Sequence, residues 1–195
     1  MITIAQARRY YRNDAAHDFD HVLRVLANAR RIARTEPADR RILETAVLLH
    51  DIARADQART GRDHAAEGAR RARAILRDAP PDFVEAVCHA IAAHRFRVNN
   101  PPQTIEAKIL YDADKLDAIG AVGVARAFAF SGHHNQPLWA EDESGLHSPW
   151  QEYRQKLVKI RDNLLTESGR RLAQQRHDFM VQFFAQLQAE IRGER

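Results

Sequence analysis

The sequence Leu48-Leu49-His50-Asp51-Ile52 places a histidine beside an aspartate at the end of an apolar helical segment. The residues before it have the spacing of one buried helix face: Ile42, Leu43, Ala46 and Val47. The pair therefore points inward. Burying a carboxylate without a partner costs on the order of several kcal/mol, so we expect Asp51 to meet a metal, a cation or a set of donors. For an isolated pair of this kind, a capped, hydrogen-bonded helix end is the commoner explanation.

Adjacency also restricts where such an ion can lie. Neighbouring residues on a helix project about 100° apart. His50 and Asp51 could therefore reach one ion only near the helix end, between their two directions.

Composition favours a helical protein of one domain. The chain has 195 residues, of which 45% are hydrophobic and 29% charged, and these values exclude a disordered chain. Only 8 glycines and 7 prolines interrupt long runs rich in Ala, Arg, Leu and Glu. We therefore expect an all-α fold with a single sizeable core.

Charge and cysteine content exclude several protein classes. The net charge of +4 arises from 30 basic and 26 acidic residues that alternate along most of the chain, so no nucleic-acid-binding arm stands out. The single cysteine, Cys88, rules out an internal disulfide and fits a reducing compartment. No secretory signal and no membrane-spanning stretch is visible, so we expect a cytoplasmic protein.

Apolar periodicity divides the chain into helices and connections. The predicted helices are 4–11, from the turn 13–18 to about 33, after 37 up to 51, 64–76, 82–94, 104–117, 118–130, 149–165, and after 169 to about 192. Asp82 and Glu85 have capping-box spacing, and Ser148-Pro149 is a second start signal. We expect residues 56–63 to be a connection. Residues 131–147 are expected to be a polar loop, either mobile or part of a lid, with surface histidines.

Several predicted helices carry a polar residue near one end on or beside the buried face. These residues are His21, the pair His50-Asp51, His64, His94, and the carboxylate cluster from Asp112 to Asp117. Each alone is compatible with a satisfied core residue or a solvated helix charge. Together, four histidines and two aspartates form a mixed nitrogen and oxygen ligand set, which suits Mn, Fe, Co, Ni or Zn. Helix bundles often build such sites from residues on facing helices.

The order of these residues resembles the HD superfamily of metal-dependent phosphohydrolases. The resemblance rests on His21, then His50-Asp51, then Asp114 within Ala113-Asp114-Lys115. Four segments resemble a bacterial branch of uncharacterised or nucleotide-cleaving HD proteins: 20–25, 48–52, 90–94 and 112–121. The resemblance covers residues 16–130 strongly and the C-terminus loosely. It implies one HD domain over residues 1–195, with helices 148–192 packed on its core.

The resemblance also implies a set of ligands and an all-α bundle. His21, His50, Asp51 and Asp114 are expected to bind one divalent ion, with manganese favoured. His64 and His94 lie where HD proteins with two metals place further histidines, so they are expected to hold a second ion, or else to bind phosphate or donate protons. The resemblance leaves open whether the chain holds one ion or two.

Charged residues beside the expected ligands are candidates for substrate binding. Those nominated for substrate phosphates are Lys115, Arg54, Arg95 and Arg97. Asp117 or Asp56 is expected to orient a ligand or act as a base, unless it is an exposed helix charge.

We expect first a divalent-metal-dependent phosphohydrolase that acts on nucleotides. In its narrower form, this expectation is an enzyme that cleaves a nucleoside triphosphate to a monophosphate and pyrophosphate. A 5'-nucleotidase and a dinucleoside polyphosphate hydrolase are alternatives of the same class. An HD-type di-iron oxygenase shares the ligand set. A non-catalytic nucleotide-binding module ranks lowest, because none of the core four ligands is missing. No nucleic-acid or membrane partner is expected, and the oligomeric state is open.

Overall fold

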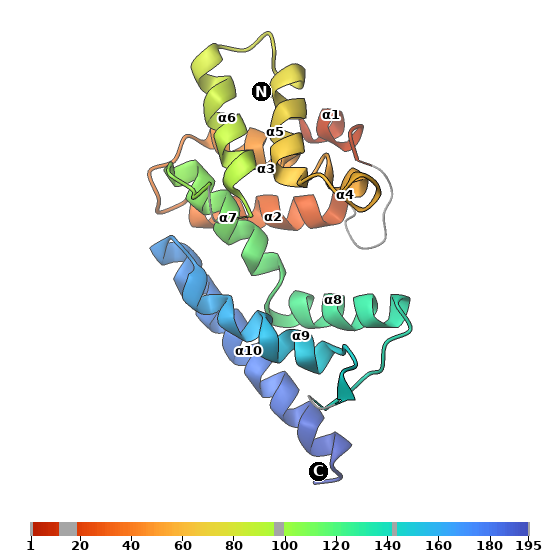
Figure 1. The fold of residues 1–195 in the computed structure, drawn as a ribbon. Helices are drawn as coiled ribbons and strands as arrows, with labels where there is room; N and C mark the ends of the chain where they lie inside the picture. Colours follow the sequence, from red (N-terminus) through yellow and green to blue (C-terminus); the bar gives the residue numbers. More distant parts are fainter. Residues whose placement is uncertain (1, 12–18, 96–99, 142–143, 195) are drawn as a thin grey trace. The chain divides into compact units, whose positions relative to one another are not determined.

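The protein is described here by a computed structural model of residues 2–11, 19–95, 100–141 and 144–194, except for the side chain of Ala58. All regular structure in these ranges is helical, without a strand, which confirms the all-α prediction. The chain forms two compact units, Met1–Asp114 and Lys115–Arg195 (Figure 1). One domain over residues 1–195, with helices 148–192 packed on its core, stays a prediction.

The first unit contains the helices that carry the predicted ligands. They are α1 (Ile4–Arg8), α2 (Phe19–Ile32), α3 (Arg40–Leu49), α4 (Arg54–Thr60), α5 (His64–Ile75), α6 (Pro81–Ala93) and most of α7 (Ile105–Asp117). Side chains define three helix starts. Thr3 caps α1, Asp39 accepts backbone N–H groups at the start of α3, and Asp63 does the same for α5. These caps fix where each helix begins and thus which residues face inward.

Helix α3 lies at the centre of the first unit. It packs against α2 and α6, and α6 packs along α5, as Figure 1 shows. The contacting faces are largely apolar and closed to solvent. Their most buried residues are Val22, Val25, Ala29 and Ile32 on α2, Leu43, Val47 and Leu49 on α3, and Val87 and Ile91 on α6. This burial holds the end of α3, and with it His50 and Asp51, inside the unit.

Residues 56–63 differ from the prediction. Most of them belong to α4, which ends at Gly61 with a φ of 69°. This left-handed conformation suits glycine and terminates the helix. The sequence reading overlooked α4 because a two-turn helix of polar residues has no apolar periodicity to detect.

The start of α6 also differs. The predicted capping box of Asp82 and Glu85 does not form, since Pro80 occupies the cap position and Pro81 opens the helix. Glu85 instead makes an ion pair with Arg73 of α5. A proline at the first helical position removes one of the N–H groups that a helix start leaves without a backbone partner.

The second unit contains α8 (Gly120–His133), α9 (Pro149–Gln155), two short 3-10 helices (η2, Leu157–Lys159, and η3, Arg161–Asn163) and α10 (Glu167–Ile191). Helix α10 packs against α8 and η3, and α8 packs against α9. Phe184 is fully buried, and its ring stacks on that of Tyr153 with a centroid distance of 4.2 Å. Ser148 caps α9 as predicted.

Three predictions for the second unit were inaccurate. The helix expected over 149–165 ends at Gln155 and continues as the 3-10 turns. The last helix begins at Glu167, not after Gly169, because Thr166 supplies the cap. The sequence of residues 118–130, small and apolar with two glycines, is compatible with a close-packed buried helix, yet α8 exposes many of its residues, and Phe179 of α10 is 45% exposed. Small apolar residues alone did not distinguish a buried helix from a surface one.

Among the described residues, none of the helices is both long enough and apolar enough to cross a bilayer.

Candidate metal centre

The two adjacent candidate ligands, His50 and Asp51, lie directly after the end of α3. The regular helix stops at Leu49, and the next turn tightens. The amide of His50 bonds to the Val47 carbonyl at 3.5 Å, and that of Ile52 to the Leu49 carbonyl at 3.4 Å. These bonds span three residues where an α-helix spans four. The regular α-helix therefore ends directly before the two candidate ligands.

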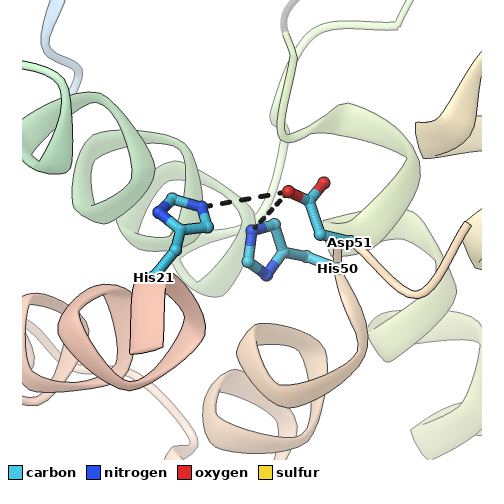
Figure 2. A group of neighbouring side chains, drawn as sticks. All are labelled: His21, His50 and Asp51. Carbon is cyan, nitrogen blue, oxygen red and sulfur yellow. Dashed lines mark ion pairs between the residues drawn. The ribbon is translucent and has the colours of Figure 1, made fainter. Parts of the chain in front are cut away.

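One group of candidate ligands lies on the Oδ2 side of Asp51. Figure 2 shows His21 of α2 and His50 directed at this carboxylate. Oδ2 lies 3.9 Å from Nε2 of His21 and 3.7 Å from Nε2 of His50. Ligand atoms of the three residues lie within 4.8 Å of one another, and all three residues are buried. The Asp114 Oδ1 atom of α7 lies 3.4 Å from His21 Nε2 and adds a second carboxylate.

A second group lies on the Oδ1 side of the same carboxylate. Asp51 Oδ1 is 3.2 Å from Nε2 of His64 and 3.7 Å from Nε2 of His94. Their ligand atoms also lie within 4.8 Å of one another. Successive imidazole rings are neighbours, with centroids 5.5 Å apart for His21 and His50, 5.2 Å for His50 and His94, and 5.3 Å for His94 and His64. The four rings thus form an arc around one shared carboxylate.

Hydrogen bonds fix which ring nitrogen faces Asp51. Nδ1 of His50 lies 2.8 Å from the Val47 carbonyl, and Nδ1 of His94 lies 2.6 Å from the Ile91 carbonyl. A carbonyl oxygen only accepts, so each Nδ1 carries the proton and donates it. Nε2 of each ring is then left with a lone pair directed at the carboxylate, the form in which imidazole binds a metal.

His64 is held differently. Its Nδ1 makes a short hydrogen bond to the side-chain oxygen of Gln57, and an Arg54 guanidinium nitrogen lies 3.1 Å from the same ring atom. Gln57 and Arg54 both belong to α4, the helix that the sequence did not predict. The orientation of this ring thus depends on side chains, whereas those of His50 and His94 depend on backbone carbonyls.

Protonation favours the metal-binding forms. Burial lowers the pKa of His50 from 6.5 to about 4, despite the nearby Asp51 carboxylate. Burial also lowers the pKa of His64. Burial alone would raise the pKa of Asp51, but the imidazoles of His50, His64 and His94 outweigh it and lower this pKa well below its usual value. Near neutral pH His50 and His64 are thus neutral while Asp51 is ionised.

Buried polar atoms without a hydrogen-bond partner are consistent with a cation beside Asp51. His50 Nε2 and Asp51 Oδ1 are buried without a hydrogen-bond partner. The lone pairs of His50 Nε2 and Asp51 Oδ2 face one another across 3.7 Å with no proton between them, which is unfavourable in a dry interior. A divalent ion would satisfy both kinds of donor atom, so the residues present fit a mixed histidine and carboxylate metal site.

Backbone packing brings α5 and α7 to the site. A Cβ placed on Gly68 of α5 would lie 3.2 Å from the His50 carbonyl oxygen, so glycine permits the close approach that sets His64 beside Asp51. On the other side, the Asn28 amide of α2 donates to the Ala113 carbonyl at 3.1 Å. This buried hydrogen bond connects the helix of His21 with that of Asp114.

The residues nominated for substrate binding lie in different surroundings. Arg54 lies beside His64, as described. Arg95 donates to Asp63, the cap of α5, at 2.8 Å. Arg97 lies outside the described residues. Lys115 follows Asp114 on α7 and is the first residue of the second unit.

The nominated carboxylates make ion pairs with arginines. Asp117 is 1% exposed and accepts from Arg126 at 2.9 Å within the second unit. Asp56 pairs with Arg71 at 2.7 Å and with Arg59 at 3.1 Å. Neither contact involves a candidate ligand.

Sequence reasoning missed Gln57, Asp63 and Gly68. Only Asp63 gave a recognisable signal, since an aspartate directly before His64 is a typical cap. Elsewhere in the described chain, no further group of three or more His, Cys, Asp or Glu residues has metal-binding spacing. His133 and His134 are exposed, which agrees with their expected surface position.

Comparison with known proteins identifies the family. The HD domain profile matches residues 18–119. The uncharacterised protein YpgQ of Bacillus subtilis is 36% identical over 183 residues, which is 92% of this chain and 86% of that protein. A crystal structure of YpgQ in complex with ADP has a TM-score of 0.79 at 34% identity, covering 98% of this chain and 99% of that one.

Two further solved structures bear the description of HD superfamily hydrolases. One, from an uncultured Thermotogales bacterium, is 35% identical with a TM-score of 0.69, and the match covers 96% of this chain and 88% of that one. The other, from Bacillus thuringiensis, is 29% identical with a TM-score of 0.78 and covers 97% and 94%. With a matching profile over more than half of its length and a relative above 30% identity over nearly all of it, this chain belongs to the HD domain family.

Proposed function

We propose that this protein is a divalent-metal-dependent phosphohydrolase that acts on nucleotides. One observation carries the proposal: four buried histidines direct Nε2 atoms at both oxygens of the single Asp51 carboxylate. The crystal structure of the relative YpgQ with ADP supports a nucleotide as the substrate class. The HD superfamily hydrolases among the structural relatives support hydrolysis as the reaction class.

In this proposal the chain holds one or two ions around Asp51. His21, His50, Asp51 and Asp114 bind the first, and His64 and His94 complete a second position on Oδ1. We favour manganese, since the donor set mixes nitrogen with carboxylate oxygen. A bound divalent ion would lower the pKa of a coordinated water and neutralise charge on a phosphoryl group.

Cationic side chains then determine where the phosphates lie. Arg54 stands beside His64 and is our first candidate for contact with phosphate oxygens. Lys115 and Arg97 remain candidates by their positions in the sequence. Arg95 already pairs with Asp63, so we assign it to holding the start of α5 in place near His94.

The narrower form of the proposal is cleavage between the α and β phosphates of a nucleoside triphosphate. The oxygen of water forms a bond to the α phosphorus and gives up a proton to solvent, the bond to the bridging oxygen breaks, and pyrophosphate leaves. The charge on the leaving pyrophosphate increases, and the Arg54 guanidinium offsets it.

Product analysis tests this function. Metal-stripped protein is reloaded with Mn²⁺ and incubated with nucleoside mono-, di- and triphosphates, beside an Asp51→Ala variant. We expect the wild type alone to release pyrophosphate from triphosphates. Release of orthophosphate from monophosphates would indicate a 5'-nucleotidase, and a dinucleoside polyphosphate added to the panel tests the remaining alternative. A wild type as silent as the variant on every substrate would refute the proposal.

The shared carboxylate also favours a second candidate. Four histidines and two aspartates, with Asp51 between two histidine pairs, are equally the ligand set of a di-iron oxygenase of this family. Oxygen uptake that requires bound iron would support this candidate. Nucleotide hydrolysis with manganese under nitrogen would refute it.

A further inference from the structure

Tyr11 contacts the turn that carries the His50-Asp51 pair. It follows α1 in the chain, and its hydroxyl donates a hydrogen bond to the Leu48 carbonyl at 3.0 Å. Leu48 and Leu49 are the last two residues of α3. A residue far away in the sequence thus reaches the helix end where both candidate ligands lie.

The carbonyl that Tyr11 binds would otherwise lack a backbone partner. The Val47 carbonyl accepts from the His50 amide and ring, and the Leu49 carbonyl accepts from the Ile52 amide. In a continuing helix the Ile52 amide would bond to the Leu48 carbonyl, but the tightened turn diverts it by one residue. The Tyr11 hydroxyl fills the place that the diverted amide vacates.

The Tyr11 hydroxyl is also close to Asp51 itself. The pKa of Tyr11 is raised well above its usual value, by burial first and by the Asp51 carboxylate second, while the Asp51 backbone N–H acts in the opposite direction. Tyr11 is therefore a neutral hydroxyl that donates to one side of the turn while its oxygen faces the Asp51 amide. A hydroxyl can do both, because it has one donor and two acceptor positions.

The ring of Tyr11 contacts a second helix that carries a candidate ligand. It meets the Phe19 ring edge-on at a centroid distance of 5.2 Å. Phe19 opens α2, and His21 follows it two residues later. The same side chain therefore touches the start of α2 through its ring and the end of α3 through its hydroxyl.

We propose that Tyr11 is a positioning residue of the metal centre, whose hydroxyl holds the tightened turn after α3 while its ring holds the start of α2. It does not ligate the ion. It keeps His21, His50 and Asp51 at fixed positions relative to one another. Removal of its hydroxyl should therefore weaken metal binding more than it lowers the stability of the fold. This inference rests on the proposed metal site and adds a residue that lies outside the HD family match.

Cobalt titration of the metal-free protein tests the role of Tyr11, because Co²⁺ in such a site has visible absorption bands that report its coordination. Tyr11→Phe keeps the ring and removes only the hydroxyl. We expect its cobalt affinity to fall about tenfold, as is typical when a group that orients a metal ligand is lost, and its absorption bands to change in position or intensity.

Two variants serve as controls. Tyr10→Phe removes the hydroxyl of the neighbouring tyrosine, which is 45% exposed, and should change neither affinity nor spectrum. Ile32→Val removes one buried methylene at the far end of α2, about 16 Å along the helix from His21. It should lower the melting temperature of the metal-free protein while leaving the cobalt spectrum unchanged. Tyr11→Phe must exceed both controls in its effect on cobalt binding.

Hydrogen exchange of the metal-free wild type gives a test that needs no variant. We expect the Asp51 amide to exchange slowly, since the Tyr11 oxygen faces it. An exposed amide in the first turn of α8, such as that of Ala121, is the fast reference. Exchange of Asp51 at the reference rate would overturn the proposal, even if Tyr11→Phe did not fold.

The remaining outcomes separate this inference from the proposed function. A wild type that binds no cobalt would overturn the metal site itself, and with it the role of Tyr11. A wild type that binds cobalt beside a Tyr11→Phe variant with the same affinity and spectrum would overturn the role of Tyr11 alone. A variant whose only change is a lower melting temperature would also overturn it.

Discussion

The two sides of the Asp51 carboxylate are built by different means. On the Oδ2 side, His21 and Asp114 come from α2 and α7, which an Asn28 hydrogen bond connects, and the His50 ring is held by a backbone carbonyl. On the Oδ1 side, the His64 ring depends on Gln57 and Arg54 of the short helix α4. The ligands on the Oδ2 side are therefore held by the core of the unit. On the Oδ1 side, one of the two histidines, His64, is held by side chains of a polar helix.

This difference predicts that the two sides bind their ions with different affinity. Ligands fixed by buried backbone groups change little when substrate enters, so the Oδ2 side suits an ion that stays bound. A histidine oriented by a glutamine and touched by an arginine can respond to a phosphate that recruits the arginine. We therefore expect the Oδ1 side to bind its ion more weakly.

Removal of the shared carboxylate should have the largest effect. Asp51→Asn leaves both sides without their common ligand, so we expect metal content near zero and nucleotide hydrolysis reduced by about 10³-fold or more, ~4 kcal/mol of transition-state stabilisation. Metal analysis and initial rates measure this. Asp56→Asn is the matched control, because that carboxylate contacts arginines and no candidate ligand. Equal metal content in the two variants would disprove the central place of Asp51.

Single histidine variants separate the two sides. His21→Ala should lose the tightly bound ion, whereas His64→Ala should keep one ion per chain and lose only the second. The physical reason is that His21 shares its site with Asp114 and His50, while His64 shares its site only with His94 and the far oxygen of Asp51. Metal analysis after dialysis measures the stoichiometry. Retention of a tight ion by His21→Ala and not by His64→Ala would reverse the comparison.

The stability of the metal-free protein should depend on pH through His50. Its pKa is about 4 when folded and 6.5 in the reference state, so the unfolded chain binds more protons between these values. Stability therefore falls as pH decreases from about 6.5 to 4, by at most about 3 kcal/mol from this group. Denaturant unfolding at several pH values measures the slope. His50→Gln should flatten it, and a slope unchanged in that variant would contradict the assignment.

Loss of Gln57 should have the smallest effect on metal binding. It also tests most directly whether the two sides of Asp51 bind their ions independently. Gln57→Ala removes the hydrogen-bond acceptor of His64 Nδ1 and leaves only Arg54 beside it, so we expect the second ion to bind about tenfold more weakly while the first is unaffected. Two-phase metal titration distinguishes these steps. Gln174→Ala, an exposed change on α10 in the second unit, is a suitable control. A weakening of the first ion instead would show that the two sides are not built independently.

Much of this arrangement was accessible from the sequence. The stripes of α2, α3, α5 and α6 were readable because apolar residues recur with helical spacing. His21, His50, Asp51, His64 and His94 stood out as polar residues on or beside those stripes, and the structure brings all five together. Their roles as ligands stay predictions that metal analysis will test.

The rest depends on contacts that periodicity does not encode. Gln57 and Tyr11 contact the site through side chains whose sequence context is that of ordinary polar and aromatic residues. Asp117 looked like part of the acidic cluster, yet it makes an ion pair with Arg126, nine residues further on. Arginines are frequent in this chain, so charge alone could not tell which of them lies beside a ligand.

The hydrogen bond between Asn28 and Ala113, 85 residues apart, has a consequence for how the protein is made. His21 leaves the ribosome early, but it has no carboxylate partner on α7 until that helix has been synthesised and has closed onto α2. The complete site therefore exists only after contacts between residues more than 80 positions apart have formed. A chain that ends before α7 would lack Asp114 and with it the second carboxylate beside His21.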